Sequence, residues 1–464
     1  MGAAVGLLVA LGWSGAAPAQ SPAAPLELEE VLDSVRGTHP GLEEAQQVVE
    51  ERDGKAFAAR GGFDPVLSIK GKWAPVGYYP KGHLDALVQQ ATPLWGISAY
   101  AGYRIGLGSY EVYKGDLQTR EGGEVRAGIN IPLWRNGPID ERRAKIRRTK
   151  LERRGAEYEL DAAQLFIERD ATKAYWAWVA AGKNLEVAQA LLEIAKAREA
   201  GLTEQVAAGS VRPIVLTDNR RLMLDREAKV VEAELKLQSA TLELSLFLRD
   251  REQRPVRPGA ERLPPGFPGT GLTDLGSLDD AVARALQQRP DALALEVKRE
   301  AAGVDVRLAA NQRGPKADLQ AFAARDMGPG LAELQPTELG VGMTVEMALP
   351  LRKARGEYRA AQAKAAQVDA KRRGLRDKVE AEVRKAWVSV EAAQQRVGLA
   401  QDQRDAAAQL AEAERELLRQ GSSDLLAVNL REVAEANAAT LEIDALANYH
   451  QARADLVAAV GGTL

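Results

Sequence analysis

The sequence has no cysteine, and this absence excludes several kinds of site. Disulfides, zinc-thiolate centres, iron–sulfur clusters and lipid attachment at a cysteine all need a thiol. The three histidines, His39, His83 and His450, are far apart in the sequence and form no pair with metal-ligand spacing. We therefore expect neither a metal site nor a catalytic histidine.

The chain also lacks a charge excess and long apolar runs. Its 62 basic and 65 acidic residues give a formal net charge of -3, which argues against an electrostatic nucleic-acid binder. After residue 19, no run approaches the ~18–20 apolar residues of a membrane-spanning helix. Residues 3–13 are apolar and precede Ala17-Pro18-Ala19, which predicts export and a signal peptide over residues 1–19; the alternative is a buried N-terminal segment.

The usual sequence motifs of enzymes are missing as well. We find no nucleophile–histidine–acid constellation and no GxxxxGK[ST] phosphate loop. The prediction is a protein that is not an enzyme, uses no cofactor and hydrolyses no nucleotide.

The chain repeats one order of elements twice. The segments "LELEEVLDSVRGTHP" and "GSLDDAVARALQQRP" each predict an amphipathic helix that runs into a proline, Pro40 or Pro290. The first repeat covers residues 26–253 and the second covers 276–461, with a proline- and glycine-rich linker over 254–275. After the opening helix, we expect in the first repeat strands over about 63–133, a long helix over 139–207, a turn over 208–212 and a return helix over 213–250. In the second repeat, we expect strands over about 316–349, a long helix over 356–420, a turn over 421–424 and a return helix over 425–460.

The long helices are typical of coiled coils. No proline interrupts residues 139–207, which would span ~100 Å as a helix. Aromatic residues make up only 5% of the chain, whereas alanine is abundant, as expected for closely packed helices. Small apolar residues recur at sevens: Val383, Val390 and Val397, accompanied by Ala386, Ala393 and Ala400.

The strand segments combine alternation with clustered aromatic residues. "AYAGYRIGLG" and "EVRAGINIPLW" alternate with a period of two, and nine of the 17 Trp and Tyr residues lie between 63 and 134. This pattern favours a membrane β-barrel with aromatic girdles, the alternative being a soluble β-domain. The first repeat has 32 more residues than the second between its two prolines, Pro40 to Pro132 against Pro290 to Pro350. These residues predict either an extra hairpin near 84–93 and 96–106 or a long loop, whereas the second repeat needs only strands near 316–325 and 338–348.

These features together resemble the TolC family of outer-membrane efflux proteins. The resemblance rests on both opening helices, both proline pairs at the strand-to-helix handover (Pro132-Leu133 and Pro350-Leu351) and both glycine turns, at Gly209 and Gly421. It implies an α+β membrane protein: a homotrimer with one shared outer-membrane barrel that continues as a periplasmic coiled-coil tunnel. Four strands per copy, the family pattern, would give 12, and an extra hairpin in the sheet would give 18; we favour 12. At each handover, proline would end strand pairing and take a φ value that a first helical turn accepts.

The resemblance also implies a function and its partners. The chain would be a passive exit duct for efflux or type I secretion, embedded in outer-membrane lipid, with a periplasmic adaptor and an inner-membrane pump supplying energy. The alternative is an adaptor-like or structural coiled-coil protein without a barrel. The adaptor would dock at the tips formed by Gly209, Ser210, Val211, Gly421, Ser422 and Ser423, where Ser210 or Ser422 would cap the next helix.

A charged gate near the tips is the part of this resemblance where the sequence departs from the family pattern. The family often has acidic residues six and nine positions after the second tip glycine, but this chain has Ala427 and Leu430 there. The remaining candidates for a charged constriction are Asp218 and Asp424, held shut through Arg212.

Overall fold

The computed structural model describes residues 24–110, 117–271 and 276–462, so the expected signal peptide lies outside the described residues. The chain divides into two compact units. Unit 1 comprises residues 1–37, 170–271 and 393–451, and unit 2 comprises residues 38–169, 272–392 and 452–464. Each unit therefore contains segments of both sequence repeats.

Helices make up most of the described chain. The two longest have 67 and 68 residues, equivalent to ~100 Å each, and begin and end within four residues of the expected positions. Two helices between the opening helices and the strands were not assigned from the sequence; both begin at the repeated prolines, Pro40 and Pro290. The helices are α1 (Leu28–Thr38), α2 (Pro40–Arg60), α3 (Glu141–Ala207), α4 (Pro213–Leu244), α5 (Leu278–Gln288), α6 (Pro290–Asn311), α7 (Arg352–Arg419) and α8 (Leu425–Val460).

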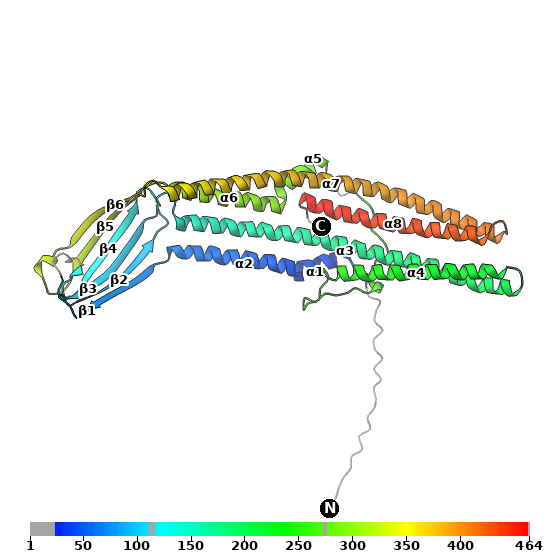
Figure 1. The fold of residues 1–464 in the computed structure, drawn as a ribbon, viewed down its shortest axis with the longest axis horizontal. Coiled ribbons are helices and arrows are strands. Elements are labelled where there is room, and N and C mark those ends of the chain that lie inside the picture. Colours follow the sequence, from blue (N-terminus) through cyan, green and yellow to red (C-terminus); the bar gives the residue numbers. More distant parts are fainter. Residues whose placement is uncertain (1–23, 111–116, 272–275, 463–464) are drawn as a thin grey trace, which may run out of the picture. The chain divides into compact units, whose positions relative to one another are not determined.

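Unit 2 carries one antiparallel sheet whose six strands follow the order of the sequence (Figure 1). The strands are β1 (Val66–Ala74), β2 (Lys81–Ala91), β3 (Ser98–Gly108), β4 (Glu124–Pro132), β5 (Lys316–Asp326) and β6 (Glu338–Glu346). The pair β4–β5 joins the two repeats, with Glu124 opposite Asp326. The 32 extra residues of the first repeat form β2, β3 and their turn inside this sheet, so the preference for four strands per copy is wrong.

The strand-to-helix handovers lie near the proline pairs, but neither proline opens a helix. β4 ends at Pro132, whereas α3 begins at Glu141, where the Asp140 carboxylate accepts a hydrogen bond of 2.8 Å from the Arg143 backbone N–H. In the second repeat, Pro350 follows a cis peptide bond and α7 begins two residues later, after Leu351. The expectation that proline supplies the first helical turn is therefore wrong. An acidic cap starts α3 instead.

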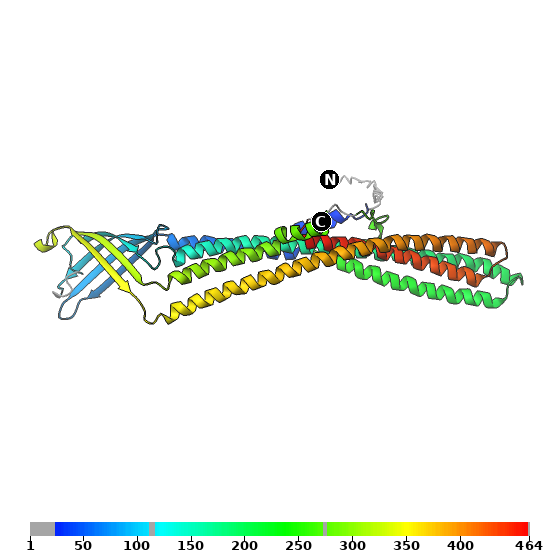
Figure 2. The ribbon, with the colours of Figure 1, turned by 90° about the horizontal axis from the view of Figure 1, so that it is seen from above.

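Two helical hairpins in unit 1 position the candidate site. α3 returns as α4, and α7 returns as α8, with both turns at the same end of the unit (Figure 2). Away from the turns, an aromatic and aliphatic core includes Trp178 and Leu244, both completely buried. The Tyr175 hydroxyl lies in this core and donates a 2.8 Å hydrogen bond to the Leu26 carbonyl. The expected coiled-coil positions Val383, Val390 and Val397 are buried along α7.

Candidate functional site

The two hairpin turns of unit 1 have the same backbone geometry. Gly209 and Gly421 adopt φ values of +73° and +72°, a left-handed conformation that strongly favours glycine. In each turn, the residue after the glycine donates its N–H five residues back, Ser210 to Gln205 and Ser422 to Leu417, both at 2.9 Å. These bonds satisfy carbonyl groups that the end of a helix leaves unpaired, the arrangement of a Schellman motif. The repeated glycine turn of the sequence is therefore a repeated helix stop.

The return helices do not begin with the serines. α4 begins at Pro213, with Arg212 as its N-cap, and the arginine side chain makes no capping bond. α8 is capped by Asp424, whose carboxylate accepts a 2.8 Å hydrogen bond from the Ala427 N–H. The expected capping by Ser210 or Ser422 is therefore wrong. Ser423 instead donates its hydroxyl to Glu414 on α7, which ties this turn to its own hairpin.

The candidate gate residues are not brought together within one chain. Asp218 pairs with Arg221 on α4 at 3.2 Å, and both side chains are largely exposed. Asp424 is engaged as the helix cap. Within the three described ranges, no ion pair joins Arg212 to either aspartate. Any charged ring formed by these residues would therefore need further copies of the chain.

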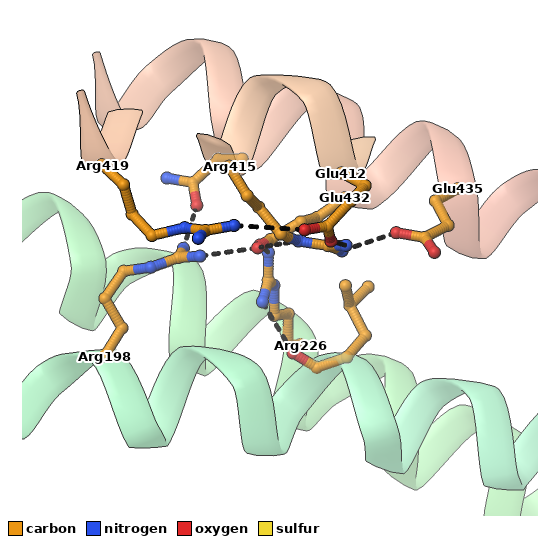
Figure 3. Close-up of polar contacts among 9 residues, drawn as sticks. Arg198, Arg226, Glu412, Arg415, Arg419, Glu432 and Glu435 are labelled. Atoms are coloured by element: carbon orange, nitrogen blue, oxygen red, sulfur yellow. Dashed lines mark hydrogen bonds and ion pairs between the residues drawn. The ribbon is translucent and has the colours of Figure 1, made fainter. Parts of the chain in front are cut away.

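A buried ionic network, absent from the sequence predictions, connects the two hairpins behind the turns (Figure 3). Glu432 on α8 is 1% exposed and accepts hydrogen bonds from Arg198 on α3, at 2.6 Å, and from Arg226 on α4, at 3.2 Å. Arg415 on α7 completes the set, with its Nε 3.6 Å from the same carboxylate. One carboxylate on α8 therefore contacts arginines from the other three helices of the two hairpins. Arg198 also donates to Asn429 Oδ1 at 2.5 Å.

Arg226 is the most strongly desolvated cation of this network. Its side chain is 2% exposed, and it also donates to the Leu191 carbonyl at 2.6 Å. Burial lowers the pKa of Arg226, and the hydrogen bond to Glu432 and its negative charge offset part of that shift. Because a buried ion left without its partner costs ~3–5 kcal/mol, Glu432 and Arg226 depend on each other.

The sheet of unit 2 has two chemically opposite faces. Direct strand partners share a face, so the register assigns every side chain. One face is almost wholly apolar and yet exposed: Leu339 and Val341 on β6 are 80% and 78% exposed. This apolar face carries Leu67, Ile69 and Trp73 on β1, Leu84, Ala86 and Val88 on β2, Ala101, Tyr103, Ile105 and Leu107 on β3, Val125, Ala127, Ile129 and Ile131 on β4, Leu319, Ala321 and Ala323 on β5, and Leu339, Val341, Met343 and Val345 on β6.

The opposite, polar face carries most of the charges of the sheet. Asp85 on β2 accepts from Arg104 on β3 at 3.1 Å and from Arg126 on β4 at 2.5 Å. This cluster ties three neighbouring strands together. Other members of the polar face are Lys70, Lys72, His83, Gln89, Tyr100, Glu124, Asn130, Asp318, Gln320, Glu338, Thr344 and Glu346.

The turn between β2 and β3 is anchored to the first handover. The Trp95 indole N–H donates a 2.9 Å hydrogen bond to the Pro132 carbonyl, and Thr92 Oγ1 donates to the Ile97 carbonyl at 2.8 Å. Trp95 and its neighbour Leu94 are nevertheless well exposed, as are Leu133 and Trp134. Exposed aromatic residues therefore gather at the helix end of the sheet, where β4 meets the start of α3.

Two other kinds of feature are missing from the described ranges. None of the helices there has an apolar stretch long enough to cross a membrane. No group of three or more histidine or acidic side chains in those ranges has an arrangement that would hold a metal ion.

The second repeat is similar to a known protein family. Residues 281–462 match the family described as "Outer membrane efflux protein". The match covers nearly all of the second repeat. The TolC-family resemblance is confirmed, and with it an outer-membrane location and a role in efflux. Curated protein sequences gave no match to the chain.

Solved outer-membrane channels share the fold of this chain. VceC from Vibrio cholerae is 18% identical, covers 94% of this chain and 96% of its own, and has a TM-score of 0.65. The Neisseria gonorrhoeae MtrE channel is 16% identical, with 94% and 89% coverage and a TM-score of 0.66. The Campylobacter jejuni CmeC channel is 16% identical, with 94% and 85% coverage and a TM-score of 0.64. At these identities the likeness establishes the fold.

Proposed function

We propose that three copies of this chain close one outer-membrane barrel and conduct cargo passively from the periplasm to the cell exterior. The observation that carries the proposal is a six-stranded sheet with one exposed apolar face, one polar face and unpaired outer edges on β1 and β6. In lipid, unpaired backbone groups at a sheet edge cost several kcal/mol each, so such a sheet must close. The apolar face would contact lipid and the polar face would line the lumen.

The strand dimensions agree with this arrangement. Each strand has nine or 11 residues, the length of a tilted transmembrane strand. Three copies would supply 18 strands. With ~4.8 Å between strands and a tilt of ~40°, the barrel would be ~36 Å in diameter, wide enough for a water-filled lumen.

The alternative of a coiled-coil protein without a barrel is not favoured, because it leaves the exposed apolar face without a partner. The family's role as a transport channel also supports the interpretation that the chain is not an enzyme. Energy would come from an inner-membrane pump, joined to the duct through a periplasmic adaptor.

Cross-linking of the two sheet edges tests closure directly, since a chain without cysteine has no background reactivity. We would introduce Ser68→Cys on β1 together with Thr344→Cys on β6, and treat intact outer membranes with a short bis-maleimide. Covalent trimers are expected. The matched control is Ala101→Cys on β3, which has paired strands on both sides and should stay monomeric. Monomers from the β1–β6 pair, with electron microscopy showing no threefold barrel of 18 strands, would overturn the proposal.

We further propose that the exposed tips receive the adaptor, at Gly209, Ser210 and Val211 and at Gly421, Ser422 and Ser423. The repeated turn geometry supports this role, because it presents two similar surfaces at one end of unit 1. Single cysteines at Ser210 and Ser422 carrying a photoreactive group should capture the adaptor in cells. A cysteine at Lys229 on α4, exposed but away from the tips, is the control. Equal capture at Lys229 would contradict docking at the tips.

The charged constriction remains a proposal of the same kind. Asp218, Asp424 and Arg212 all lie on exposed positions near the tips, where three copies would form rings of charge. Replacing Asp218 by Asn should reduce the block of conductance by divalent cations in planar bilayers. The same replacement at Asp444, which lies farther along α8 and bonds to Asn184, should leave the block unchanged. If both variants are blocked like the parent channel, Asp218 is not part of a constriction.

A further inference from the structure

The polar face contains a row of alternating aromatic and glycine residues across four strands. Tyr100 on β3 is opposite Gly128 on β4, Gly128 is opposite Phe322 on β5, and Phe322 is opposite Gly340 on β6. We call these four residues the aromatic row. They lie toward the helix end of the sheet, two residues from the start of β3.

Both rings of the aromatic row lie across the neighbouring strand. A methyl group on Gly128 would lie 2.6 Å from Cζ of Tyr100, and one on Gly340 would lie 2.2 Å from Cε1 of Phe322. The glycines therefore leave the room that lets each ring lie close over the adjacent strand. Each ring is half-buried, so part of it stays open to the space above the polar face.

On its helix side, the aromatic row has polar but uncharged neighbours. The adjacent row, ~7 Å along the strands, contains Ser98, Asn130 and Gln320 as direct partners. Asn130 Oδ1 is buried and accepts no hydrogen bond from the described part of the chain. On the other side, the next row is also ~7 Å away and contains Arg126 on β4, which is paired with Asp85, and Glu338 on β6.

We propose that the aromatic row and its amide neighbours form a binding platform in the lumen for uncharged molecules with a flat apolar face and a hydrogen-bonding edge. The proposal rests on the proposed barrel, in which three copies contribute six rings at one level. Ring faces stack on aromatic groups or on the apolar face of a sugar ring, and the amides of Asn130 and Gln320 bond to polar edges. Because such molecules carry no charge, their binding there depends little on salt.

The test uses purified, detergent-solubilised protein and two neutral probes, N-acetyltyrosinamide and maltotriose. Saturation-transfer difference NMR measures the dissociation constant of each probe for the parent protein and for Tyr100→Leu and Phe322→Leu. Leucine keeps an apolar side chain but removes the ring face. We expect each substitution to weaken binding about two- to tenfold, and the parent constant to be equal at roughly 0.05 M and 0.5 M salt.

The matched control is Tyr103→Leu. Tyr103 also lies against a glycine, Gly123, but belongs to the apolar face, so its loss should leave binding unchanged. Binding of the tyrosine amide alone would identify aromatic cargo, and binding of maltotriose alone would identify saccharides; either result supports the platform. Absence of binding, or equal loss in all three variants, would overturn it. Electron microscopy of the same samples distinguishes failure of the platform from failure of the proposed barrel. An intact 18-stranded trimer without binding refutes only the platform. Absence of the trimer refutes the proposed function as well.

Discussion

Replacing Glu432 by alanine should open the two hairpins locally. The substitution leaves Arg226, which is 2% exposed, without its carboxylate, and removes one of the two partners of Arg198, which keeps Asn429. Loss of one member of a buried ion pair costs ~3–5 kcal/mol. Arg198 and Arg415 are 17% and 29% exposed and therefore gain some hydration, so we expect a value near the lower end, about 3 kcal/mol.

Hydrogen–deuterium exchange measured by mass spectrometry detects this opening directly. A local loss of about 3 kcal/mol corresponds to a roughly 100-fold increase in exchange for the slowest amides of α4 and α8 near Glu432. Strand amides of unit 2 serve as an internal reference and should exchange as in the parent protein.

Two variants make the measurement decisive. Glu435→Ala removes a 2.6 Å bond to Arg415, but Glu435 is 32% exposed, so exchange should rise less than about fivefold. The double variant Arg226→Met with Glu432→Leu removes both charges of the buried pair and should recover much of the protection, because no unpaired ion remains from that pair. If Glu432→Ala and Glu435→Ala gave the same exchange, burial of the network would not control its strength.

Three further outcomes follow from single sites. Burial, together with the charge of Glu27, raises the pKa of Tyr175 to about 12, so the folded state favours the neutral phenol. The contribution of this neutral phenol to the free energy of unfolding is complete below the ordinary pKa of ~10. About 3 kcal/mol of it is lost as the pH rises from ~10 to ~12. Tyr175→Phe should therefore reduce the loss of helical circular dichroism above pH 10. At pH 8 the same change should cost about 1 kcal/mol, because the hydrogen bond to Leu26 is lost. If the circular dichroism of the variant fell as steeply above pH 10 as that of the parent, the burial argument would be contradicted. Gly421→Ala should lower the thermal midpoint of unfolding, because alanine at a φ of +72° costs about 1–2 kcal/mol. The control Gly374→Ala lies in an exposed part of α7 with open space around it and should raise the midpoint slightly. A lower midpoint in both variants would show that the turn geometry is not the cause. Val341→Lys on the apolar face should cost about 2–4 kcal/mol and reduce the amount of protein in outer-membrane fractions. Thr344→Lys, on the polar face of the same strand, should leave this amount unchanged. Equal amounts of the two variants would argue against contact of the apolar face with lipid.

Helices, turns and handover positions were visible in the sequence because their signals are local. A glycine at a helix end, a proline before a helix and valines at sevens each act within a few residues. The number of strands, in contrast, has no local signal in the sequence. Residue spacing alone left the hairpin and the loop open, and the preference for four strands came from the family resemblance. Strand pairing joins distant residues such as Gly128 and Phe322, so only the folded sheet could settle the number.

The ionic network was missed for a related reason. Its four helices come from both repeats, and the sequence does not show which faces meet. One signal was nevertheless present on α4, where the buried positions Asn219, Arg226, Ala233 and Ala240 recur at sevens. Polar residues at two successive core positions of a heptad are unusual and indicate buried partners. A search for charged residues inside apolar heptads would therefore have found Arg226, although not Glu432.

The unequal strand numbers of the two repeats have a geometric explanation in the proposed trimer. An inserted hairpin adds two strands, so the chain returns to the helix end of the sheet. α3 therefore begins at the same end of the sheet as α7 does in the second repeat. In unit 2, α2, α3, α6 and α7 run alongside one another, which gives 12 helices in three copies (Figure 1). At ~9–10 Å between neighbouring axes, a ring of these helices has a circumference of about 110–120 Å. Twelve strands tilted by ~40° would span only about 75 Å, whereas 18 span about 113 Å. The hairpin of β2 and β3 therefore lets the barrel continue the ring of helices at nearly the same width, without a step at the handover.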